Sequence, residues 1–163
     1  MNQSSPREVA PAHTRLRGFT VVELLIVVVV CALLMSIAVP TYQSHVLRGK
    51  DAVANTDISE IELAISHYEV SNNGALPPDL AAVSMDTKLD PWGNPYRYLN
   101  TTGLNGNGQG IRKIKNLVPV NTDYDLYSIG PDGRTTGALT AAASQDDIIR
   151  ANNGAYIGLA SDY

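Results

Sequence analysis

Residues 19–39 read FTVVELLIVVVVCALLMSIAV, and this stretch decides the fold. Its only charged residue is Glu23. At about 1.5 Å of rise per residue, a helix of this length reaches roughly 30 Å, which is the thickness of the hydrocarbon core of a bilayer. Arg15 and Arg17 precede the stretch and Pro40 follows it. Because basic residues favour the cytoplasmic side, we expect a membrane-spanning helix with the rest of the chain on the far side.

A carboxylate inside a membrane segment costs on the order of 2.5–3.5 kcal/mol on insertion scales, so Glu23 requires an explanation. It is the fifth residue after Gly18. Gly18, Phe19, Glu23, the apolar run and Pro40 together resemble the class III signal of type IV pilins and secretion pseudopilins. The resemblance implies cleavage between Gly18 and Phe19 by a prepilin peptidase, and N-methylation of Phe19. It also implies assembly into a helical filament, in which the Glu23 carboxylate neutralises a free terminal amine.

Two other interpretations of this stretch stay open. It could be an ordinary signal anchor that carries a glutamate without a role. It could also be a cleaved secretory signal, since residues 36–38 form a small-x-small triplet that a signal peptidase accepts. Both interpretations leave Glu23 without a function, and the second also requires an unusually long apolar region.

Composition limits what the rest of the chain can do. Removal of residues 1–18 lowers Lys+Arg from 12 to 9 and Asp+Glu from 16 to 15, so the formal net charge changes from −4 to −6. This balance argues against binding of nucleic acid through a basic surface. Cys31, the single cysteine, lies in the apolar run, which excludes an intrachain disulfide. An exported domain must then be held together otherwise, and a bound metal is one candidate.

The segment after Pro40 carries one apolar stripe at helical spacing, formed by Ala54, Ile58, Ile61, Ile65 and Tyr68. We therefore expect one helix over 19–72, kinked at Pro40 and ended by Gly74. The predicted plan is a cleaved leader (1–18), the helix (19–72, with 19–39 as the transmembrane and polymerisation segment) and a C-terminal globular domain (73–163). The predicted fold is α+β and pilin-like, with the long N-terminal helix packed on a small antiparallel β-sheet.

Residues 90–98 read DPWGNPYRY and closely resemble the DPWGNPY motif of the major pseudopilin of type II secretion. We expect a rigid turn there, with Trp92 closing the end of the helix–sheet core, and a strand beginning at Tyr96. A short helix is expected near 79–84, a flexible linker at 101–110, and further strands at 111–118 and 124–129.

The loop from Gly130 to about Ile149 is the candidate metal site. Its start lies within DYDLYSIGPDG (residues 123–133), which resembles the pseudopilin segment that leads into a calcium-binding loop. The resemblance implies Ca²⁺ held by Asp132, Asp146 and Asp147 with nearby backbone carbonyls, the oxygen ligands that calcium takes. The loop and the tail after it are longer than the family pattern, and a solvated acidic loop is the alternative. Arg112, Lys113 and Lys115 are expected in a second solvated loop.

Nothing in the sequence predicts catalysis. The motifs of serine hydrolases, P-loop proteins and zinc proteases are absent, and His45 and His67 have no partner at ligand spacing. The resemblance implies a structural subunit of the type II pseudopilus, anchored in the inner membrane with its C-terminal domain in the periplasm. Other pseudopilins and the secretion assembly platform would be its partners. The alternatives are a type IV pilus pilin for adhesion or motility, and a signal-anchored periplasmic binding module that does not polymerise.

Overall fold

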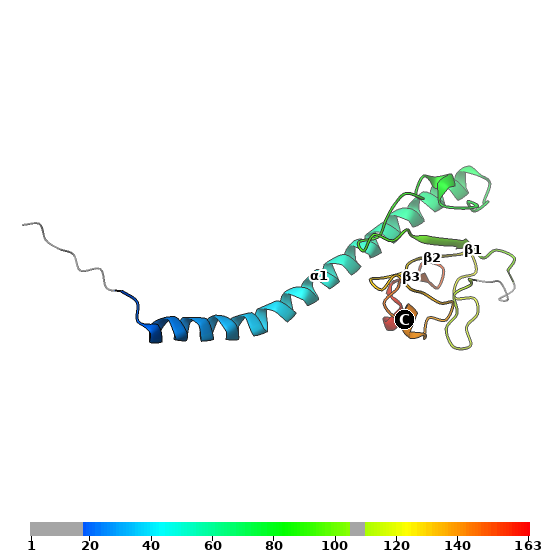
Figure 1. Ribbon diagram of the computed structural model, residues 1–163. Coiled ribbons are helices and arrows are strands. Elements are labelled where there is room, and N and C mark those ends of the chain that lie inside the picture. Colours follow the sequence, from blue (N-terminus) through cyan, green and yellow to red (C-terminus); the bar gives the residue numbers. More distant parts are fainter. Residues whose placement is uncertain (1–17, 105–109) are drawn as a thin grey trace, which may run out of the picture. The chain divides into compact units, whose positions relative to one another are not determined.

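The computed structural model describes residues 18–104 and 110–163 (Figure 1). The expectations for residues 1–17, which include most of the leader with Arg15 and Arg17, lie outside the described residues, as does 105–109 of the expected linker. The chain divides into two compact units, Met1–Tyr42 and Gln43–Tyr163. The second unit thus includes the part of the long helix that follows Tyr42.

Helix α1 spans Val21–Ser71 and continues through Pro40 without a break in its assignment. It is long and apolar enough to cross a membrane, and its most apolar window has no buried residue. Its end follows from local chemistry: Asn73 and Gly74 adopt positive φ, and the Gly74 N–H donates to the Glu69 carbonyl at 2.9 Å. Such left-handed residues satisfy carbonyls that would otherwise lack a partner at a helix end.

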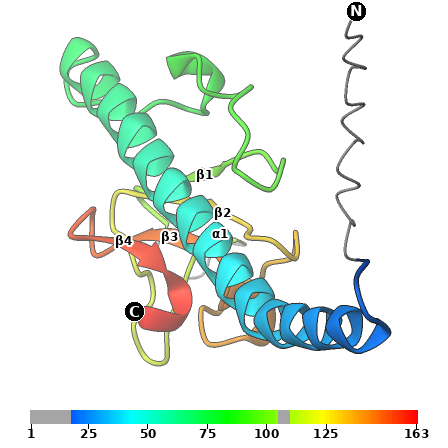
Figure 2. The ribbon, with the colours of Figure 1, turned by 90° about the vertical axis from the view of Figure 1, so that its left-hand side faces the viewer.

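Four strands form one antiparallel sheet in the order β1-β2-β3-β4. Their bounds are Arg97–Asn100 for β1, Tyr124–Ser128 for β2, Ile148–Ala151 for β3 and Tyr156–Leu159 for β4. In Figure 2 the C-terminal part of α1 lies in front of this sheet. The expected α+β fold, a long N-terminal helix packed on a small antiparallel sheet, is therefore confirmed.

The sheet is covered on both faces, because alternate residues of β2 and β3 point to opposite sides. One face carries Tyr124, Leu126 and Ile148, which pack with the apolar stripe of α1. The stripe isoleucines Ile58, Ile61 and Ile65 are fully buried there. The other face forms a second core with the segments between the strands, made of Val120, Leu139, Ile149, Ala151 and Ala160. The strand at β2 was predicted, but the second core was not.

One expectation about the strands of the C-terminal unit was wrong. The strand expected at 111–118 is absent: this segment is a turn, with isolated bridges between Ile114 and Leu117 and between Lys113 and Ala138. Lys115 adopts a positive φ of 48°, which lies outside the β region of backbone conformation. The tail after Arg150, which is longer than the family pattern, contributes to the hairpin of β3 and β4. By contrast, the expected short helix near 79–84 is present as a 3₁₀ turn, Ala81–Val83.

Candidate functional site

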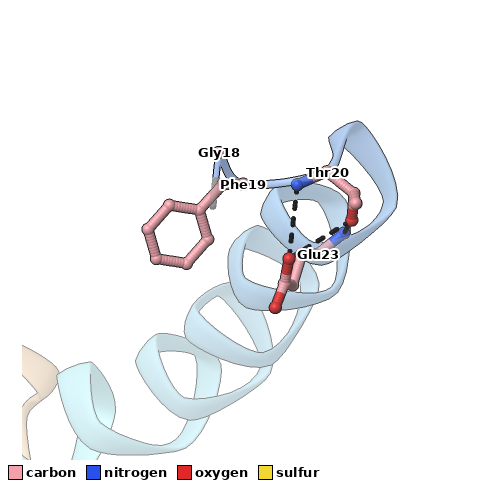
Figure 3. Close-up of a pocket in the computed structure, with 4 residues that line it drawn as sticks. All are labelled: Gly18, Phe19, Thr20 and Glu23. Atoms are coloured by element: carbon pink, nitrogen blue, oxygen red, sulfur yellow. Dashed lines mark hydrogen bonds between the residues drawn. The ribbon is translucent and has the colours of Figure 1, made fainter. Parts of the chain in front are cut away.

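The start of α1 holds the first group of predicted site residues, Gly18, Phe19 and Glu23 (Figure 3). The Glu23 Oε2 accepts hydrogen bonds from the Thr20 N–H at 3.2 Å and the Thr20 hydroxyl at 3.3 Å. In return the Thr20 Oγ1 accepts from the Glu23 N–H at 3.2 Å. This reciprocal pair is a capping box, which satisfies two N–H groups that have no partner inside the helix.

The capping box holds the Glu23 carboxylate against the backbone N–H of Thr20, the residue that follows Phe19. Cleavage after Gly18 would create the terminal amine on Phe19. The Phe19 side chain is exposed. The sequence signal for this arrangement is Thr20-x-x-Glu23, and Thr20 was not among the predicted site residues. Pro40, the other predicted assembly residue, lies further along α1 and is not brought to this group.

The second group lies in the C-terminal unit, where the 90–95 turn meets the start of the 130–149 loop. Asp90 is buried; its Oδ1 accepts from the N–H groups of Trp92 at 3.0 Å and Asn94 at 2.8 Å, and its Oδ2 accepts from the Ser128 hydroxyl at 2.5 Å. The Asn94 amide donates to the Gly130 carbonyl at 3.0 Å. The two segments that carried the resemblance thus contact each other, and the turn supports the loop. Trp92 packs partly buried against the core.

Gly130 brings the two ends of the loop together. Its φ is +66°, and a Cβ added there would lie 2.4 Å from the carbonyl oxygen of Asp146. Only glycine combines this backbone conformation with so close an approach of another backbone segment. The loop therefore closes on itself next to Asp146.

The structure brings the predicted ligands Asp132 and Asp146 together. The Asp132 N–H donates to Asp146 Oδ2 at 3.3 Å, while the Asp132 carboxylate accepts from the Arg134 N–H at 2.8 Å. Asp132 is exposed and Asp146 is half-buried. The Asp146 Oδ1 is buried and has no hydrogen-bond partner among the described residues.

Asp147 is fully buried, and its partner is Arg112. The Asp147 Oδ2 accepts from Arg112 Nη2 at 2.8 Å and from the Thr135 hydroxyl at 2.6 Å. Burial raises the pKa of Asp147 to about 6, against the lowering by Thr135 and Arg112. Arg112 is only 3% exposed, so its assignment to a solvated loop was wrong. Its neighbours Lys113 and Lys115 are exposed, as expected.

These residues fit a hard cation in part. Asp146 Oδ1 and Asp147 Oδ1 are two buried carboxylate oxygens without a hydrogen-bond partner among residues 18–104 and 110–163. Carboxylates and loop carbonyls are the ligands that Ca²⁺ takes. Within the same residues, however, no three acidic, histidine or cysteine side chains converge as a metal group. Any Ca²⁺ would therefore depend heavily on backbone carbonyls of the loop.

Comparison with known proteins identifies the family. Residues 14–39 match the family model described as the prokaryotic N-terminal methylation motif. The chain is 30% identical over 142 residues to the type II secretion system core protein G of Pseudomonas aeruginosa, and this alignment covers 74% of the chain and 87% of the relative. The chain belongs to the type II secretion system core protein G family. This membership confirms the resemblance predicted from the N-terminal signal and from the motifs at 90–98 and 123–133.

Other relatives agree with membership in the core protein G family. The core protein G of Escherichia coli is 30% identical over 142 residues, which is 75% of this chain and 86% of the relative. A shorter similarity extends to a pilus protein: the fimbrial protein EcpC of Eikenella corrodens is 30% identical over 92 residues, 56% of each chain. No solved structure gave a significant match.

Proposed function

We propose that this chain is a structural subunit of a type II secretion pseudopilus, which helps to export folded proteins across the outer membrane. In this proposal a prepilin peptidase cuts between Gly18 and Phe19, and Phe19 is then methylated. The subunit stays in the inner membrane through the start of α1, with its C-terminal unit in the periplasm. It then polymerises with further copies and with other pseudopilins on the assembly platform. No catalytic role is part of the proposal.

The observation that carries this proposal is the first part of α1. Its apolar side chains are exposed throughout 18–42, and none of the residues that the structure describes buries them. An apolar surface of this extent requires lipid or another protein around it. A segment that spans the membrane and later packs against the same segment of other copies is covered by lipid before assembly and by protein in the filament. A simple anchor is covered by lipid alone.

A second candidate is a subunit of a type IV pilus, which the similarity to the fimbrial protein EcpC supports. The same helix serves both kinds of filament. A signal-anchored module that does not polymerise is the third candidate, and it differs from the first two in needing no carboxylate at Glu23.

Deletion of the gene tests the proposed role. In a bacterium that encodes this chain, we expect proteins that normally reach the medium to accumulate in the periplasm, and a plasmid copy to restore their export. The ratio of secreted to periplasmic enzyme activity is the measurement. Normal export combined with lost adhesion or twitching motility would instead identify a type IV pilus subunit. Normal export and normal pilus functions would leave the non-polymerising module.

We further propose that the 130–149 loop binds Ca²⁺ through Asp146, with Asp132, Asp147 and loop carbonyls. The ion would supply positive charge for the two buried carboxylate oxygens that lack a hydrogen-bond partner among the described residues. It would thereby strengthen the closure of the loop next to Gly130. Binding to the folded state alone stabilises it, by about 2.7 kcal/mol at a hundredfold excess of the ion over its dissociation constant.

Removal of calcium should therefore lower the thermal midpoint of the protein in detergent micelles by about 5 °C or more relative to excess Ca²⁺. Mg²⁺ should not replace Ca²⁺, because it requires a stricter geometry. The Asp146→Ala variant should lose the response to calcium, whereas the control Asp86→Ala, at an exposed position outside the loop, should keep it. Equal midpoints with calcium and with a chelator would refute the calcium proposal.

A further inference from the structure

We infer that Arg112 is the cation that fastens the 130–149 loop to the sheet. The family resemblance predicts a metal ion at this loop and no role for an arginine. The loop is anchored by a residue of this chain before any ion binds. This inference goes beyond the proposed function, because it holds whether or not the loop also binds Ca²⁺.

The contacts of the Arg112 side chain lead to both ends of the loop. Its Nη2 donates to Asp147 Oδ2 at 2.8 Å, at the end of the loop. Its Nη1 donates to the Thr136 carbonyl, near the start. Asp147 in turn accepts from the Thr135 hydroxyl at 2.6 Å. One guanidinium therefore joins two loop segments that are separated by a turn and a 3₁₀ helix, Ala142–Ser144.

Arg112 is itself fixed to the sheet. Its guanidinium stacks on the ring of Tyr127 in β2, with 3.6 Å from Cζ to the ring centroid. Its backbone N–H donates to the buried Asp125 Oδ2 at 2.8 Å, also on β2. The planar guanidinium suits this position, since it can stack on a ring and donate to two acceptors at once. A lysine or a hydrated point charge cannot make the same set of contacts.

The backbone next to Arg112 extends the attachment. The Lys113 N–H donates to the Gly137 carbonyl at 2.8 Å, and the Leu139 N–H donates to the Lys113 carbonyl at 2.9 Å. Leu139 is buried in the second core. These two N–H groups report on the loop, because they exchange with solvent when it detaches from the 112–113 segment.

Removal of the positive charge should release the loop even without any metal. A buried carboxylate that loses its cationic partner is strongly unfavourable, and Asp147, which pairs with Arg112, is fully buried. The calcium proposal places a second cation at Asp132, Asp146 and the Oδ1 of Asp147, whereas Arg112 contacts the Oδ2 of Asp147. The two proposals therefore make separate predictions. The Arg112 inference predicts an attached loop in the presence of chelator, and the calcium proposal predicts additional stability when Ca²⁺ is added.

Hydrogen exchange of the full chain in detergent micelles, in excess chelator, tests the inference. The wild type should retain protection in peptides that cover 135–147 and 113. The Arg112→Gln variant should exchange at least tenfold faster there, while peptides that cover 54–65 of α1 stay unchanged. The matched control is Arg134→Gln, an exposed arginine of the same loop, which should behave as wild type.

Two outcomes would overturn the inference. One is a wild type whose loop is unprotected in chelator and becomes protected only with Ca²⁺, because the metal would then be the fastening cation. The other is an Arg112→Gln variant that exchanges like the wild type. If Arg112→Gln also exposes 54–65, the Arg112→Lys variant decides. Faster exchange at 135–147 alone supports the inference, and wild-type exchange there refutes a specific role of the guanidinium.

Discussion

Replacement of Glu23 by alanine or by glutamine is expected to abolish filament assembly and reduce export to the level of the deletion strain. Two roles are possible for this carboxylate, and the two variants separate them. A capping box functions with Gln as well as with Glu. Neutralisation of a terminal amine requires the negative charge. If the charge is what matters, both variants fail.

The Thr20→Ala variant is the matched control for Glu23. It removes the hydroxyl that accepts from the Glu23 N–H, but leaves the charge in place. Loss of such a cap costs about 1 kcal/mol, a small effect on a helix held by lipid or by other copies. We therefore expect Thr20→Ala to retain most of the export activity. The measurements are sheared filaments detected by immunoblotting, and the secreted fraction of an exported enzyme.

Normal assembly of Glu23→Gln together with failure of Glu23→Ala would show that Glu23 acts as a cap and not through its charge. Normal export with both variants would contradict the polymerising role and favour the non-polymerising module.

Replacement of Arg150 by methionine is expected to lower the free energy of unfolding by about 3 kcal/mol. Arg150, on β3, is buried, and its guanidinium joins α1 to the start of β2. Its Nε donates to Glu62 Oε1 at 2.7 Å, and its Nη2 donates to Asp123 Oδ2 at 2.7 Å. It also stacks on Tyr124, with 4.0 Å from Cζ to the ring centroid.

The magnitude follows from what the substitution leaves behind. Breaking a buried ion pair usually costs 3–5 kcal/mol, because the remaining charge is buried without a partner. The side chains of Glu62 and Asp123 are 26% and 31% exposed, so water partly replaces the lost partner, and we take the low end of this range. Burial lowers the pKa of Arg150, but hydrogen bonds to Asp123 and Glu62 outweigh it and raise the pKa overall. The guanidinium is therefore charged at every pH at which the protein folds.

Urea unfolding followed by the fluorescence of Trp92, the single tryptophan, measures this effect. The control is Arg97→Met, because Arg97 is an exposed arginine on β1 of the same sheet. It should change the free energy of unfolding by no more than about 0.5 kcal/mol. Equal midpoints for the two variants would mean that the Arg150 contacts do not contribute to stability.

The sequence was sufficient for the helix and for the family. The spacing of Ala54, Ile58, Ile61 and Ile65 predicted which face of α1 is buried, because a helix repeats every 3.6 residues whatever packs against it. Residues 19–39 predicted an exposed apolar segment, because the composition of one continuous stretch can be judged without knowledge of distant residues. The alternation in β2 was visible too, since successive side chains of a strand point to opposite faces.

The sheet beyond β2 could not be predicted in this way. The strands β3 and β4 have four residues each, and both β3 faces are buried, so β3 shows no alternation of apolar and polar residues. Residues 111–118 were expected to form a strand but form a turn, because the bridge to Ala138 and the core around Leu139 determine their path. Local propensity is a weak guide where pairing with distant segments decides the outcome.

The candidate site was also predictable from the sequence only in part. The sequence by itself determined which carboxylates stand at the two ends of the loop and that Glu23 is alone in the apolar segment. Only the tertiary structure decided that Asp147 pairs with Arg112, that Asp90 and Asn94 support the loop, and that Arg150 joins α1 to the sheet. These partners are far apart in the sequence, and an ion pair or hydrogen bond imposes no periodicity on the residues around it. Their charges therefore resemble those of any solvated loop until the fold brings them together.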